Sequence, residues 1–150
     1  DFCLSRGLGD VYKRQNMNLS FLHRYLPTLI ILCAILYLSL APAPIPDADK
    51  LHLFKGADKV VHFCMYGGLI LVFCFDLYRQ DPFNKYRTQQ TIIACISAIL
   101  LGGGIELLQG YMGMGRSADW YDFAANSAGA IAGLLCSHYL IRRWLRKVKK

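Results

Sequence analysis

Charged residues are scarce in this sequence, and acidic ones most of all. Only 18% of the 150 residues are charged, whereas about a quarter is usual in a soluble domain. Hydrophobic residues make up 55%, which excludes an intrinsically disordered chain, because such chains contain few large apolar residues. The formal net charge is nevertheless +7. A nucleic-acid-binding protein is therefore indicated only if the basic residues form a patch on one face.

Paired cysteine motifs are missing as well. No two of the six cysteines form a CxxC pair, and none has the Cys/His spacing of a zinc site. The sequence therefore predicts neither a disulfide scaffold nor a zinc centre. Five cysteines stand inside apolar runs and are expected to be small buried hydrophobic residues: Cys33, Cys64, Cys74, Cys95 and Cys136. The composition points to a membrane protein.

The first 16 residues are expected to be foreign to the protein. Asp10–Gln15, with the sequence DVYKRQ, resembles the translated end of a transposon-based sequencing adapter fused in frame. We therefore expect residues 1–16 to be an assembly scar and residues 17–150, beginning at Met17, to form one domain. Removing the net charge of +1 carried by the scar leaves +6. A genuine basic tail is the alternative.

Four apolar runs are each long enough to cross a bilayer as a helix, since a span needs about 20 mostly apolar residues. They are Tyr25–Pro46, Val60–Tyr78, Thr88–Ile105 and Phe123–Ile141. Short connections predict an all-α, polytopic membrane protein built as a four-transmembrane-helix bundle, because irregular backbone cannot face lipid. The first run is alternatively a signal peptide cleaved at Ala41-Pro42-Ala43. We expect it to be retained.

Basic and acidic residues are distributed unequally over the two sides of such a bundle. Ten Lys and Arg fall on the side that holds both termini and the middle connection, and four on the other. This bias places both termini in the cytoplasm. The Trp144–Lys150 tail is then an anchor on anionic lipid rather than a nucleic-acid patch. We therefore expect the lipid bilayer, and no nucleic acid, as a partner.

Six of the eight acidic residues in 17–150 fall on the opposite, outer side. There the topology brings together polar residues at helical spacing from three helix ends. The resulting polar site contains Lys59, His62, Tyr66, Glu106, Gln109, Arg116, Asp119, Asp122 and Asn126. Ionisable groups within a membrane are costly and usually face the protein interior. We expect this set to form the functional site.

Single members of the set also have structural explanations. Lys59 can extend to the head groups, and Asp119 can stabilise a helix N-terminus. The Gly129-x-x-x-Gly133 pattern is predicted to serve helix packing. Glu106 is harder to explain in this way, because an unpaired carboxylate in apolar surroundings is costly.

The same residues carry a resemblance to the VanZ-like membrane proteins. From about Asp58 to Gly133, four blocks match in order and spacing: Lys59-x-x-His62-Phe63-x-x-Tyr66, Glu106-x-x-Gln109, Gly115-Arg116-x-x-Asp119-x-x-Asp122-x-x-x-Asn126 and Gly129-x-x-x-Gly133. Ile105 departs from the pattern, since many members carry an acid before the glutamate. The resemblance implies a cell-envelope protein of the bacterial cytoplasmic (inner) membrane. It also implies a link to teicoplanin, hence to antibiotic resistance, through the founding member, but no defined reaction.

Two functions are compatible with the site. In the first, an enzyme or lipid-handling protein uses Lys59 and Arg116 to bind the phosphate or carboxylate of a lipid-linked envelope substrate. His62 or Glu106 then acts as general acid or base. The oxygens of Asp119, Asp122 and Asn126 orient these groups or hold a divalent cation.

In the second, a non-catalytic structural or interaction module uses its buried polar network to fix helix packing. A proton-coupled transporter is disfavoured, because polar groups at one end define no path across the membrane. The sequence assigns no metal-ligand set, no cofactor and no oligomeric state.

Overall fold

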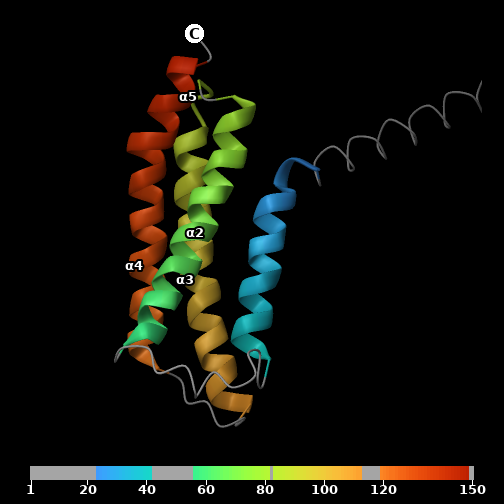
Figure 1. Cartoon of the computed structure of the whole chain (residues 1–150), viewed down its shortest axis with the longest axis vertical. Coiled ribbons are helices and arrows are strands. Elements are labelled where there is room, and N and C mark those ends of the chain that lie inside the picture. The colour runs from blue at the N-terminus through green and yellow to red at the C-terminus, as the bar shows by residue number, and fades with distance from the viewer. Residues whose placement is uncertain (1–22, 42–55, 82, 113–118, 149–150) are drawn as a thin grey trace, which may run out of the picture.

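The computed structural model describes residues 23–41, 56–81, 83–112 and 119–148 (Figure 1). Within them every regular element is helical, which confirms the all-α prediction. The elements are a first helix His23–Leu40, α2 (Ala57–Gln80), α3 (Arg87–Met112) and a last rod that joins α4 (Trp120–Cys136), the π-helical turn η2 (Ser137–Ile141) and α5 (Arg142–Val148).

Three of these helices are long and apolar enough to cross a membrane: His23–Leu40, Ala57–Gln80 and Arg87–Met112. The fourth expected span, Phe123–Ile141, lies in the last rod, which changes its hydrogen-bonding pattern at η2. The helices therefore support a membrane protein. The four crossings and their orientation remain predictions.

Burial in the described helices differs from that in a soluble bundle. Large apolar residues of α3 such as Ile93, Leu100 and Leu107 are exposed, whereas Asp76 and Asn126 are each only 1% exposed. Apolar residues face outward when the surroundings are lipid, and ionisable groups then turn to the protein interior. This arrangement agrees with a bilayer environment.

The cysteine prediction was wrong for three of the five positions. Cys74 and Cys95 are buried, whereas Cys33, Cys64 and Cys136 are exposed. An apolar run implies burial only where water surrounds the protein. When the exterior of the bundle is also apolar, an apolar run does not show which of its residues face the interior.

Helices α2 and α4 cross where glycines of α4 pack against the backbone of α2. A Cβ on Gly133 would lie 2.6 Å from the carbonyl oxygen of Gly67, and a Cβ on Gly129 would collide with the carbonyl oxygen of Phe63. Only a residue without a side chain fits at these two points. The crossing brings the first turns of α2 and α4 together, and the polar residues lie on these turns.

Two polar contacts join the first helix to α2 and α3. Thr28 Oγ1 donates a hydrogen bond of 2.8 Å to Asp76 Oδ2 on α2, and Gln109 Nε2 on α3 donates one of 2.7 Å to the Ser39 carbonyl. Such bonds are favoured inside a membrane, where no water competes for the polar groups. They set where the helix lies on α2 and α3.

Candidate functional site

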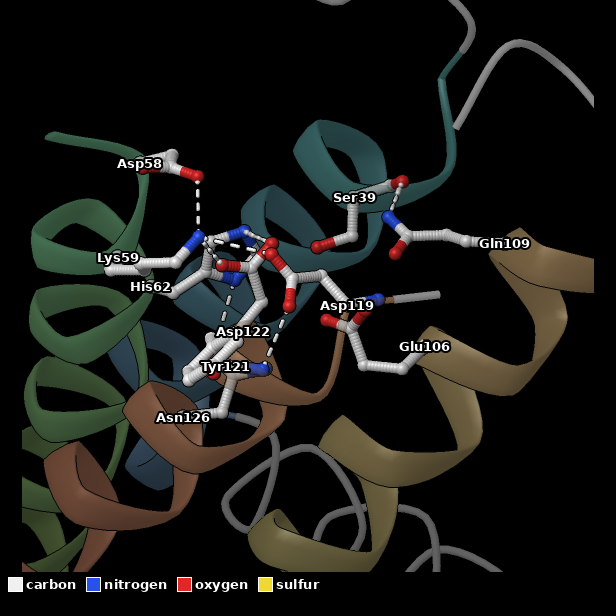
Figure 2. Close-up of polar contacts among 10 residues, drawn as sticks. All are labelled: Ser39, Asp58, Lys59, His62, Glu106, Gln109, Asp119, Tyr121, Asp122 and Asn126. Atoms are coloured by element: carbon white, nitrogen blue, oxygen red, sulfur yellow. Dashed lines mark hydrogen bonds and ion pairs between the residues drawn. The ribbon is translucent and has the colours of Figure 1, made fainter. Parts of the chain in front are cut away.

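The candidate site lies at one end of the bundle, where α2 and α4 begin and α3 approaches its end (Figure 2). Gly56 precedes α2 with a φ of 92°, a left-handed conformation that glycine adopts without strain. Asp119 is the N-cap of α4, and its Oδ1 accepts the Tyr121 backbone N–H at 2.8 Å. These two helix starts place Lys59 opposite Asp122.

Lys59 is the centre of the charged contacts. Its Nζ lies 2.9 Å from Asp58 Oδ2, 3.0 Å from Asp119 Oδ2 and 3.0 Å from Asp122 Oδ1. An ammonium group has three N–H donors, and these three carboxylates occupy all of them. An incoming phosphate would therefore have to displace a carboxylate before it could bind Lys59.

His62 lies one turn further along α2 and faces α4. Its Nδ1 is 3.0 Å from Asn126 Oδ1, and its Nε2 is 3.9 Å from Asp122 Oδ2. With the amide oxygen as acceptor, Nδ1 carries the proton and Nε2 keeps a lone pair. Asp122 is then placed to stabilise the imidazolium that forms when Nε2 takes up a proton. In this tautomer, His62 can accept a proton while Asn126 orients its ring.

Glu106 of α3 is 4% exposed. Its Oε2 accepts the Asp119 backbone N–H at 3.3 Å. Among the described residues, its Oε1 and the buried hydroxyl of Tyr66 have no hydrogen-bond partner. The Tyr66 hydroxyl lies 3.3 Å from where a Cβ on Gly102 would be, one turn from Glu106. Buried polar atoms without partners are rare, so the absence of a partner at each of these two atoms requires an explanation.

The structure brings together most of the expected site residues. Gln109 lies apart from the Lys59 contacts, because its side chain reaches Ser39 of the first helix (Figure 2). Arg116 lies outside the described residues. Asp58 joins the site although the sequence interpretation did not include it. Its position directly before Lys59 was the available signal.

The described part of the site has more negative than positive groups. Four carboxylates surround one ammonium and one imidazole: Asp58, Asp119, Asp122 and Glu106 around Lys59 and His62. No three or more His, Cys, Asp or Glu residues in the described ranges are arranged to hold a metal ion. The described residues therefore offer no ligand set for the divalent cation considered in the sequence analysis, because three of the carboxylates contact Lys59 instead.

Asp119 should give the fold an acid-sensitive contribution to stability. The Tyr121 N–H and the Lys59 ammonium hold the pKa of Asp119 below its ordinary value of 3.8. The carboxylate therefore stabilises the folded state above that value, and the contribution is lost as pH falls through the lower, folded-state pKa.

Thermal unfolding in detergent between pH 7 and pH 3 measures this contribution. The difference in midpoint between wild type and Asp119→Asn should shrink toward the acid end. A difference in midpoint that stays constant from pH 7 to pH 3 would show that the Asp119 carboxylate makes no such contribution.

A family model described as VanZ/LLP1 matches residues 11–142. The match includes the end of the expected scar, so the boundary at Met17 remains a prediction. Searches of the curated proteins and of the solved structures return no match. The family model covers most of the chain, and the matched range includes all four sequence blocks that suggested the resemblance. This chain therefore belongs to the VanZ/LLP1 family.

Proposed function

We propose that this VanZ-family chain is an integral membrane protein of the bacterial cell envelope that binds the head group of a lipid-linked substrate at its outer face. One observation carries the proposal: the polar end of an apolar bundle holds two buried groups, Glu106 Oε1 and the Tyr66 hydroxyl, without partners among the described residues. A bound head group would supply those partners.

The charges favour one kind of head group. Lys59 is already surrounded by carboxylates, and Glu106 adds a further acceptor. Hydroxyl and amine donors, as on the sugar or peptide part of a wall precursor, therefore suit the described site better than a phosphate held by Lys59. His62, oriented by Asn126, would take a proton from such a donor.

Glu106→Gln tests the proposal in a host strain from which the gene has been deleted. Glutamine keeps an acceptor for the Asp119 N–H but removes the negative charge. We expect the variant to fold normally, to lose complementation, and to change glycopeptide susceptibility or the envelope-lipid profile. Asp81→Asn, an exposed carboxylate at the other end of α2, is the matched control and should complement fully.

Full complementation by Glu106→Gln would refute the proposal. Folded protein is measured by size exclusion in detergent, so that a loss of function is separated from a loss of fold.

The second candidate is a non-catalytic module whose polar network fixes helix packing. Its support is that carboxylates of the protein itself use all three donors of Lys59, and two of them belong to the start of α4. In this case Glu106→Gln should lower the amount of folded protein and complementation in the same proportion.

A further inference from the structure

A second concentration of polar groups lies around η2 and α5. Figure 1 shows α5 at the end of the bundle opposite the starts of α2 and α4. A groove of about 540 Å³ there is lined by His138, Arg142, Arg143, Arg146 and Lys147, with Phe83 from the α2–α3 connection. Its size falls in the range of small-ligand sites. The residues of the Lys59 site do not line it.

The groove is strongly positive. Four of its lining residues are Arg or Lys, and none is acidic. Within the described ranges, no carboxylate forms an ion pair with Arg142, Arg143 or Lys147. These three side chains, which have no carboxylate partner there, favour an anion, and guanidinium groups match phosphate oxygens in pairs.

Arg142 is held in place by its surroundings. Its Nη1 donates a hydrogen bond of 2.8 Å to Thr88 Oγ1 on α3, and its guanidinium lies 5.9 Å from the centre of the Tyr78 ring. Its Nε is buried and has no partner among the described residues. The arginine is thus positioned before a ligand arrives and retains an unused donor.

The π-helical turn sets the direction of these side chains. The Arg142 backbone N–H bonds to the Ser137 carbonyl, five residues back. The wider turn rotates everything after it by about 100° relative to a continuous α-helix. Leu145 is nevertheless buried, so α5 packs on the bundle in the rotated register and presents its basic residues to the groove.

Exposed apolar side chains of η2 and α5 indicate where the ligand of the groove comes from. Tyr139 lines the groove, and Tyr139, Leu140, Trp144 and Val148 are each more than half exposed. Aromatic and apolar residues next to basic ones are typical of the head-group region of a bilayer. A ligand with a phosphate and acyl chains would meet both kinds of surface.

We propose that this groove binds the phosphate of an anionic phospholipid from the leaflet at the α5 end of the bundle. It is a site of its own, separate from the head-group site proposed around Glu106. It differs from a general attraction of the basic tail to the membrane surface, because particular side chains in a groove make the contacts.

The test uses the full chain purified in detergent, with Arg143→Gln and Lys147→Gln. Both side chains are exposed, so their replacement should leave the fold intact. Lys85→Gln is the matched control, since it removes one exposed positive charge near the same end without lining the groove. Binding of phosphatidylglycerol, phosphatidylcholine and inorganic phosphate is measured by native mass spectrometry and thermal shift.

We expect wild type to prefer phosphatidylglycerol over phosphatidylcholine. Each groove variant should weaken phosphatidylglycerol binding about tenfold, the usual effect of losing one charge-assisted hydrogen bond, while Lys85→Gln binds like wild type. Three results would overturn the proposal: an equal loss in Lys85→Gln, no preference between the two lipids, or stabilisation by inorganic phosphate alone. Complementation plays no part in this test, so its outcome is independent of the Glu106 experiment.

Discussion

Gly129→Ala is expected to abolish the folded bundle. A single Cβ at this position would occupy the space of the Phe63 carbonyl oxygen on α2. Both atoms belong to rigid helices, so only separation of α2 from α4 relieves the overlap. We expect a loss of at least about 3 kcal/mol, the upper end of the usual cost of overpacking and a large part of the stability of a typical domain.

Gly68→Ala, on the partner helix α2, is the matched control, because a Cβ there has no atom within 4 Å. Thermal unfolding and size exclusion in detergent compare the two variants. Gly129→Ala should yield aggregated or unfolded protein, and Gly68→Ala should behave like wild type. Equal midpoints for the two would show that the α2–α4 crossing is not held as described.

Lys59→Met should produce the second large effect, a marked fall in the unfolding midpoint. The substitution keeps most of the side-chain volume and removes the ammonium that Asp58, Asp119 and Asp122 share. Solvent screens the more exposed carboxylates of Asp58 and Asp119, so the cost of losing the ammonium falls mainly on Asp122, whose side chain is only 17% exposed. Three neighbouring carboxylates would then repel one another across the α2–α4 contact.

The double variant Lys59→Met with Asp122→Asn identifies the cause. Asp122 is the least exposed of the three acids, so neutralising it should recover part of the lost midpoint. The two changes would then be strongly non-additive. Lys85→Met serves as the control for loss of an exposed lysine. Additive losses in the double variant would mean that Lys59 acts through packing alone.

Helical periodicity and topology predicted which residues of the site would meet. Lys59 and His62 share one face of α2, Asp122 and Asn126 share one face of α4, and both faces lie at the same end of the bundle. The exact partners were not predictable, because they depend on how closely the two helices approach. The sequence interpretation left Lys59 available for an anionic substrate, whereas the structure surrounds it with carboxylates.

Two other features depend on tertiary structure more than on local sequence. Gln109 was grouped with Glu106 on spacing alone, but the position of the first helix directs it to Ser39. The π-helical turn at Ser137–Ile141 contains no proline or glycine that would indicate it, and the preceding glycine, Gly133, lies within α4. The sequence therefore predicted a regular helix through Ile141.

Asp119 connects three helices with the atoms of one residue. Its amide donates to Glu106 on α3, its carbonyl accepts the N–H groups of Asp122 and Phe123 in the first turn of α4, and its carboxylate both caps α4 and binds Lys59 on α2. Opening of α2 or of α3 at this end breaks a bond to Asp119, and fraying of the start of α4 breaks the Asp119 bonds to both of them. The starts of α2 and α4 and the Glu106 turn of α3 should therefore form a single cooperative unit in hydrogen exchange, protected together and exposed together.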